Sequence, residues 1–189
     1  MCGVQLSAPP MTIEQLLLRP IREDDLPAMI RLRTDPLVAR YLPYSSVPTP
    51  EDVEMALYAE MDLAATSDDT LLWGIQRLDD PRLVGHVAIW PREADIPRGE
   101  LIIQVVPSRW RQGVASAACA AAISRWLSRY SGSTVYAAVH PENRPCQRLL
   151  RKLGLNRETN GGDFPGIHAA TERVFWRAGG ADELNLPAG

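Results

Sequence analysis

The sequence predicts one α/β domain, with a central mixed sheet of about six or seven strands flanked by about four helices. Two observations predict this class. The chain of 189 residues is long enough to bury one core, and its 46% hydrophobic and 23% charged residues are typical of a globular protein. Its apolar pattern also changes repeatedly between the period of a strand and that of a helix. The expected order is β-α-α-β-β-β-α-β-α-β, and a further short strand at 155–157 stays open.

The first third of the chain predicts one strand and two helices that cover the sheet. Leu16–Arg19 is a short apolar run, typical of a strand. Asp24 and Asp25 are expected to open a helix that ends at Asp35-Pro36, because a residue before proline disfavours the helical conformation. A second helix is expected after Thr49, an N-cap candidate that is followed by proline and, three residues later, by Asp52.

The remaining segments predict most of the sheet and two further helices. Strand-like runs occur at 70–76, 83–90, 100–106, 135–139 and 171–176. An Ala-rich segment with helical spacing covers 114–130, and a second helix is expected at 143–153, ended by Gly154. We expect residues 1–14 to be an N-terminal extension, 15–177 the domain, and 178–189, rich in Gly, Ala and Pro, a flexible tail.

Composition excludes several functional classes. Lys and Arg number 20 against 23 Asp and Glu, a net charge of −3, which argues against a general nucleic-acid binder. Cys2, Cys119 and Cys146 have no metal-ligand spacing with one another or with the histidines, so we expect neither a metal site nor a disulfide framework. The sequence also lacks a signal-peptide pattern and an apolar run long enough to span a membrane, so we expect a cytoplasmic protein.

The most informative segment is the strand at 100–106 with the loop and helix that follow it. A strand that feeds a glycine-containing loop at a helix N-terminus is suited to anions, because the first amides of the helix point outward and its dipole favours negative charge. Gly113 and Ala115 would allow a diphosphate close to the backbone, and Arg109 and Arg111 would add positive charge. Neither a dinucleotide-binding glycine motif nor a P-loop is present.

The pattern Trp110-x-x-Gly113-x-Ala115 resembles the phosphate loop of the GNAT superfamily of acyl-CoA N-acyltransferases. The later run from Asn143 to Lys152-x-Gly154-Leu155 is similar to the Asn-led helix of that family. In the N-terminal half, 16–20, 23–26, 35–36 and 41–42 resemble the branch of ribosomal-protein N-terminal acetyltransferases (RimJ/RimL-like). The resemblance covers about 16–176, nearly the whole predicted domain.

The resemblance implies a mostly antiparallel sheet that is splayed between its fourth and fifth strands. Acetyl-CoA would bind in this opening as cosubstrate, with its pantetheine paired to Val105 and Val106. Backbone amides would hold its pyrophosphate; they belong to Arg111, Gln112, Gly113, Val114, Ala115 and Ser116. Asn143 is expected as a helix N-cap or a pantetheine contact, and one geometry can serve both.

The resemblance also implies that an amine attacks the thioester directly. Glu100 would accept the proton of the amine, directly or through water, or would be a solvated carboxylate at a strand end. The amide near Ile103 is the expected oxyanion donor by position. Cys146 stands where the branch commonly has Ser, and is either a weak proton donor near the CoA sulfur or a small packing residue. Many family members carry a Tyr acid at the position of Leu150, which we expect in the core.

Other candidate residues have two interpretations each. His140 would be a base near the site or a surface residue before a proline, and His86 would face the acceptor or solvent. Three arginines could reach the 3′-phosphate of CoA or lie on a solvated helix face; they are Arg144, Arg148 and Arg151. Acceptor specificity is expected from the loops 41–49, 91–98 and 160–168.

These observations favour an acetyl-CoA-dependent N-acetyltransferase that acts on a primary amine, either a protein N-terminus or a small molecule. The alternative is a module that binds CoA or acyl-CoA for regulation, without turnover. A third hypothesis is a flavodoxin-like or Rossmann nucleotide binder. The resemblance leaves a homodimer open, and we expect no metal, nucleic-acid or membrane partner.

Overall fold

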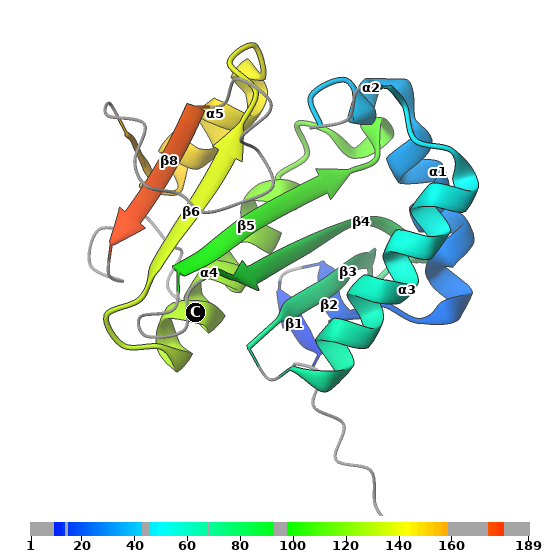
Figure 1. The fold of residues 1–189 in the computed structure, drawn as a ribbon, viewed down its shortest axis with the longest axis horizontal. Helices are drawn as coiled ribbons and strands as arrows, with labels where there is room; N and C mark the ends of the chain where they lie inside the picture. Colours follow the sequence, from blue (N-terminus) through cyan, green and yellow to red (C-terminus); the bar gives the residue numbers. More distant parts are fainter. Residues whose placement is uncertain are drawn as a thin grey trace, which may run out of the picture.

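The computed structural model describes residues 10–13, 15–42, 46–67, 69–92, 98–158 and 174–179. In this part of the chain, eight strands form one sheet in the order β1-β2-β3-β4-β5-β6-β8-β7 (Figure 1). The strands are β1 (Met11–Ile13), β2 (Leu16–Pro20), β3 (Leu71–Arg77), β4 (Asp80–Pro91), β5 (Arg98–Val105), β6 (Thr134–Val139), β7 (Asn156–Arg157) and β8 (Val174–Gly179). Six of the seven neighbouring pairs are antiparallel, and β5 with β6 is the parallel pair.

This topology confirms the α/β class and the mostly antiparallel sheet. It also argues against the flavodoxin-like or Rossmann hypothesis, because those folds are built on a mostly parallel sheet. The sheet has more strands than the expected six or seven. Met11–Ile13, inside the expected N-terminal extension, pairs with β2, and the short strand left open at 155–157 is present as β7. Of the expected last strand, 171–173 lies outside the described residues.

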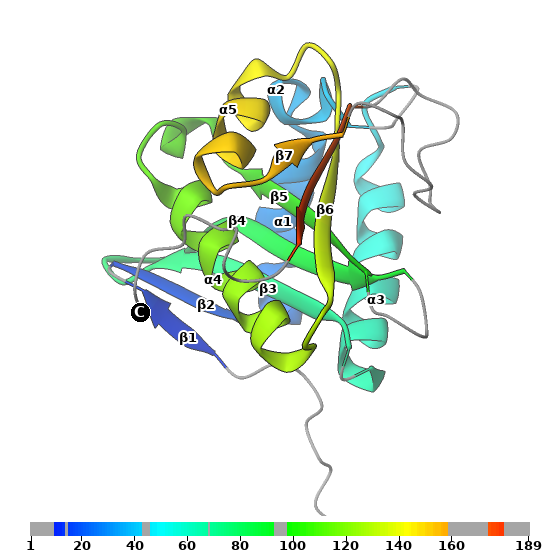
Figure 2. The same cartoon turned by 90° about the vertical axis from the view of Figure 1, so that its left-hand side faces the viewer.

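Helices cover both faces of the sheet. They are α1 (Leu26–Thr34), α2 (Pro36–Ala39), α3 (Pro50–Thr66), α4 (Val114–Arg129) and α5 (Arg144–Lys152), with single 3-10 turns at Glu23–Asp25 and Pro107–Arg109. In Figure 2, α4 crosses in front of the sheet, while α1 and α3 lie behind it. Among the described residues, no helix is both long and apolar enough to cross a membrane.

Strand alternation divides the buried side chains between two cores. Leu72 and Trp73 are neighbours in β3, but Leu72 packs with α1 and α3 while Trp73 packs in the core under α4. Leu57 and Ile123 are fully buried and anchor α3 and α4 to the two faces. The sheet is therefore a wall with a separate apolar layer on each side.

Local sequence signals set the helix boundaries of the N-terminal half. Thr49 Oγ1 accepts a hydrogen bond from the Asp52 amide, and the Asp52 carboxylate accepts one from the Thr49 amide, both at 3.2 Å. This reciprocal capping box confirms the predicted start of α3. Asp35-Pro36 ends α1 as predicted, but it also starts α2, because the Asp35 carboxylate caps the Leu37 amide at 2.8 Å.

Candidate active site

β5 and β6 pair only where they begin, at Arg98–Glu100 with Thr134–Tyr136. β5 continues to Val105 and β6 to Val139 without further pairing between them, and Figure 1 shows the two strands separating toward their carboxyl ends. The predicted splay between these two strands is therefore present. In the part of the chain that the structure describes, the edge of β5 beyond Glu100 has no neighbouring strand on the side of β6.

The main-chain groups of β5 alternate between its two edges. The Val106 amide donates to the Val84 carbonyl at 2.9 Å and therefore faces β4. Successive residues of a strand direct their main-chain groups to opposite edges, so the amides of Val105 and Ile103 face the open side. The amide of Ile103, the expected oxyanion donor, thus lies on the open side, whereas the N–H of Val106, expected to pair with pantetheine, is already bound to β4.

Trp110 fixes the loop to the end of this open edge. Its indole Nε1 donates to the Val105 carbonyl oxygen at 2.6 Å, although 44% of the residue is exposed. The Val105 carbonyl therefore has a partner within the protein. The Trp of the recognised loop pattern acts here as a clamp between loop and strand.

Two left-handed residues shape the loop between Trp110 and α4. Arg111 has φ of 63° and Gly113 has φ of 81°, a conformation that glycine adopts without strain. Gly113 is the N-cap of α4, provides no side chain to bond the first-turn amides, and has nothing within 4 Å of where a Cβ would lie. The N-cap side chain therefore bonds none of the first-turn amides, Val114 to Ser116, which is the state that an anion site at a helix N-terminus needs.

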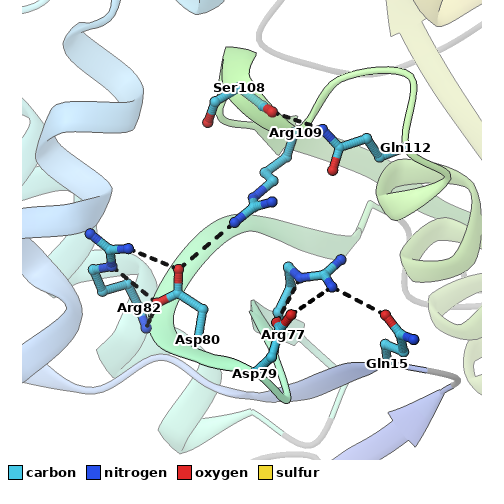
Figure 3. Close-up of polar contacts among 8 residues, drawn as sticks. All are labelled: Gln15, Arg77, Asp79, Asp80, Arg82, Ser108, Arg109 and Gln112. Atoms are coloured by element: carbon cyan, nitrogen blue, oxygen red, sulfur yellow. Dashed lines mark hydrogen bonds and ion pairs between the residues drawn. The ribbon is translucent and has the colours of Figure 1, made fainter.

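Polar contacts attach the outer part of the loop to the β3–β4 turn (Figure 3). The Gln112 side-chain amide donates to the Ser108 carbonyl at 2.9 Å. Arg109 points toward Asp80, with 3.9 Å between their charged atoms, and Asp80 also binds Arg82 at 3.0 Å. Much of the positive charge of Arg109 is therefore directed at Asp80, and Arg111 is the exposed arginine of this loop.

Asn143 and Cys146 meet at the start of α5. The Asn143 side-chain oxygen accepts a hydrogen bond from the Cys146 amide at 3.1 Å, which confirms its role as N-cap. Cys146 is partly buried against the core under α4, and burial raises the pKa of its thiol to about 11. At neutral pH this side chain is therefore a thiol, which is a weak proton donor and is unsuited to act as a nucleophile.

Leu150 lies in the core, as predicted, with 1% of its surface exposed. The position at which many family members carry a Tyr acid is thus occupied by a leucine that packs in the core. Burial also raises the pKa of the neighbouring Cys119 thiol. The protein therefore holds two protonated thiols in this region and no phenol at the family position.

Glu100 lies at the point where β5 and β6 separate, and only 2% of it is exposed. Its carboxylate accepts a hydrogen bond from Arg92 Nε at 2.8 Å and is also in contact with Arg92 Nη2. The interpretation as a solvated strand-end carboxylate is wrong, because the side chain is buried and ion-paired. Sequence reasoning missed Arg92, since only the register of β4 against β5 brings it to Glu100.

Tyr41 and His140 connect the two halves of the fold across the separating strands. Their rings lie 5.5 Å apart between centroids, and the His140 Nδ1 accepts from the Glu142 amide at 3.2 Å. Tyr41 follows α2 and His140 follows β6. We expected His140 to lie near the site. The structure also gives it an aromatic neighbour, Tyr41, that the sequence did not indicate.

His86 does not face solvent, which corrects one of its two interpretations. It is 2% exposed and lies opposite Gln104 on the face of the sheet that α1 and α3 cover. Burial and the nearby Arg33 lower the pKa of His86 to about 3, so its ring is neutral at ordinary pH.

The three arginines that could reach the 3′-phosphate of CoA lie on the surface of α5. Arg144, Arg148 and Arg151 are exposed on α5, and the Arg151 guanidinium lies 5.6 Å from the centre of the Trp176 ring. Among the described residues, no group of three His, Cys, Asp or Glu side chains could hold a metal ion. Of the expected acceptor loops, 160–168 lies outside the described residues, as do 43–45 and 93–97.

The splayed sheet and the amide-rich loop define an acyl-CoA N-acyltransferase of the GNAT type. A family model described as "Acetyltransferase (GNAT) domain" matches residues 15–156. The chain therefore belongs to the GNAT acetyltransferase family, and it is an acyltransferase. The resemblance found in the sequence is thereby confirmed at the level of the family.

Individual relatives agree with this assignment. The chain is 28% identical over 152 residues to YoaA of Bacillus subtilis (strain 168), described as an uncharacterized N-acetyltransferase; the match covers 79% of this chain and 84% of that one. A ribosomal-protein-S5-alanine acetyltransferase from Vibrio fischeri has a similar fold, with TM-score 0.73, 17% identity and coverage of 92% and 97%. RimJ of Mycobacterium smegmatis, solved with CoA-disulfide, has TM-score 0.71, 20% identity and coverage of 90% and 84%.

Proposed function

We propose that this protein transfers the acetyl group of acetyl-CoA to a primary amine by direct attack of the amine on the thioester. One observation carries the proposal: the edge of β5 beyond Glu100, which pairs with no strand among the described residues, lies next to the N-terminus of α4. A thioester cosubstrate needs hydrogen-bond partners for an extended pantetheine and an anion site for its diphosphate. The open β5 edge and the first-turn amides of α4 supply these two elements side by side.

The residues at the loop fit such a cosubstrate. Gly113 has open space where a Cβ would lie, so a diphosphate could come close to the backbone that leads into Val114, Ala115 and Ser116. On the strand, the amides of Val105 and Ile103 are directed to the open side. RimJ of M. smegmatis, which has the same fold, was solved with CoA-disulfide, which supports CoA as the ligand class.

The chain provides groups for each part of the reaction. The amine nitrogen forms a bond to the acetyl carbon while the carbon–sulfur bond breaks. The Ile103 amide would stabilise the negative charge that develops on the thioester oxygen, since a fixed donor in a dry site needs no reorganisation. The released CoA sulfur takes one proton, for which the Cys146 thiol, in the first turn of α5, is our candidate.

Glu100 is our candidate for handling the proton that leaves the amine. Its carboxylate is buried at the base of the strand separation, where the proposed reaction would take place. Because Arg92 binds the same carboxylate, proton transfer through an intervening water fits better than direct contact. The roles of Glu100, Cys146 and Ile103 are parts of the proposal, as is the binding role of Asn143.

The acceptor is a primary amine, either a protein N-terminus or a small molecule. The fold shared with ribosomal-protein acetyltransferases supports an N-terminal amine, and a small amine is the alternative. The cysteine pattern favours a cytoplasmic location, and a homodimer stays a prediction.

The decisive experiment is an acceptor screen that measures CoA release from acetyl-CoA. We expect release that depends on an amine, and a decrease of about 10²-fold or more in Glu100→Gln with unchanged CoA affinity. The matched control is Glu158→Gln, which removes another ion-paired glutamate, bound to Arg177 at 2.9 Å, away from the strand separation. Tight CoA binding with no turnover across a broad amine panel would instead favour a regulatory module, a hypothesis that Leu150 at the Tyr position keeps open.

A further inference from the structure

A buried polar cluster lies on the face of the sheet that α1 and α3 cover. His86 in β4 and Gln104 in β5 are direct cross-strand neighbours, and they are 2% and 8% exposed. Arg33 of α1, 4% exposed, approaches them from the helix layer and influences the charge of His86. The mechanism proposed above uses none of these three side chains.

The cluster lacks hydrogen-bond partners that its burial demands. Neither ring nitrogen of His86 has a partner, nor do the Gln104 side-chain oxygen and Arg33 Nε, among the described residues. The Gln104 amide lies near enough to influence the pKa of His86, but no hydrogen bond of normal geometry joins them. Leaving several buried polar atoms unpaired is costly, and such groups call for a ligand or a water.

The charge of the cluster selects the kind of ligand. The other nitrogens of Arg33 hold Glu60 in a two-pronged ion pair at 2.8 and 2.6 Å, so this pair is neutral as a unit. His86 is also neutral and offers one donor and one acceptor, and Gln104 adds an acceptor. An uncharged group with both a donor and an acceptor matches this set, whereas an ion would remain unbalanced.

The cluster lies beside the place of reaction. Gln104 directly follows Ile103, whose amide faces the open β5 edge. On the cluster's own face, Gln104 is flanked along β5 by Ile102 and Val106, which pack against the helix layer while remaining partly exposed. On either side of Gln104, two residues of this face are therefore only partly buried, and the strand that carries them also carries the Ile103 amide.

We propose that His86 and Gln104 form a polar subsite that binds an uncharged hydroxyl or carboxamide of the acceptor. This inference rests on the proposed function, since it concerns the acceptor of the same reaction. The subsite would make the enzyme prefer amines that carry such a group over amines of equal length that do not.

The test compares amino alcohols and ω-amino amides with n-alkylamines of matched chain length. With wild-type protein and acetyl-CoA, we expect kcat/KM to favour the polar member by about tenfold at one preferred length. In Gln104→Leu and His86→Phe, the ratio should fall to about one. Ser133→Ala is the control, because it also removes a fully buried hydroxyl without a partner, outside the cluster, and it should keep the wild-type ratio.

A second measurement separates a ligand subsite from a structural role. If the polar atoms await a ligand, the apolar variants should melt at the same temperature as the wild type or a few degrees higher. A decrease of more than about 5 °C in both variants would mean that the protein itself satisfies these groups, and would overturn the proposal. An equal rate for polar and apolar amines in the wild type would also overturn it, with the proposed function intact.

Failure of the proposed function gives a different result. In that case acetyl-CoA binds but no amine is acetylated. Calorimetric titration of the same amines into the CoA-loaded protein then tests the polar subsite separately from the acetyl transfer. Preferential binding of the polar amines that is lost in Gln104→Leu supports it, and equal binding refutes it.

Discussion

The indole nitrogen of Trp110 donates a 2.6 Å hydrogen bond to the carbonyl oxygen of Val105, the last residue of β5. This contact joins the loop before α4 to the strand whose free edge faces β6. It therefore fixes the distance between two parts of the proposed CoA site, the strand amides and the helix N-terminus. Because the residue is 44% exposed, its contribution lies more in this bond than in burial.

Trp110→Phe removes this hydrogen bond while retaining an aromatic ring. We expect the KM for acetyl-CoA to rise about five- to tenfold, because the loop amides lose their fixed position, and stability to fall by about 0.5–1.5 kcal/mol. Steady-state kinetics and denaturant unfolding measure the two effects. The control is Tyr58→Phe, another exposed aromatic position, on α3. An unchanged KM would show that the clamp does not position the loop.

Gly113→Ala tests the loop through a matched pair of glycines. Gly113 and Gly132 have φ of 81° and 78°, and neither has an atom within 4 Å of the place where a Cβ would lie. An alanine at either site should cost about 1–2 kcal/mol of stability through left-handed strain alone. Only Gly113→Ala should also weaken acetyl-CoA binding, by about tenfold or more, because its methyl group enters the space expected for the diphosphate. If calorimetry finds equal affinities for acetyl-CoA in the two variants, the diphosphate does not bind next to Gly113.

Local signals in the sequence predict the capping box of Thr49 and the end of α1 at Asp35-Pro36, because both depend on residues within one helical turn. The loop from Trp110 to Ala115 is also predicted, since its pattern carries its own geometry. In contrast, Glu100 with Arg92, Tyr41 with His140, and His86 with Gln104 are brought together by sheet register or by packing of distant segments. No local pattern encodes these pairs. The separation of β5 from β6 was expected only from the family resemblance.

Asn143 offers a way to separate capping from ligand binding. Asn143→Ala should lower stability by about 1 kcal/mol, because the Cys146 amide loses its cap. Asn143→Asp keeps an oxygen for that amide and should keep the stability, but it replaces the side-chain NH₂ with a carboxylate oxygen. If the NH₂ binds pantetheine, the KM for acetyl-CoA rises in both variants. If Asn143→Asp keeps the wild-type KM for acetyl-CoA, Asn143 acts as the helix cap and does not bind pantetheine.

Cys146 should make stability depend on alkaline pH. Its thiol has a pKa of about 11 in the folded protein against 9.0 for a free thiol, so the folded state retains a proton that the unfolded state loses. Stability therefore falls as pH rises from about 9 to about 11, by an amount of the order of 2 kcal/mol. Cys146→Ala should show a smaller fall than the wild type in unfolding measured across this range, with the Cys119 contribution common to both. Equal slopes would place the thiol in a solvated environment.

His86 should have the opposite effect on the acid side. Its pKa is lowered to about 3 from 6.5, mainly by burial and further by Arg33, so the unfolded chain binds a proton that the folded protein does not. Its contribution to stability is present above about pH 6.5 and is lost as pH falls toward 3, by roughly 3–5 kcal/mol in total. His86→Phe should flatten the stability curve between these limits. Denaturant unfolding at pH 4 and pH 7 gives the comparison, and a wild-type slope in His86→Phe would mean that the imidazole accepts a proton in place.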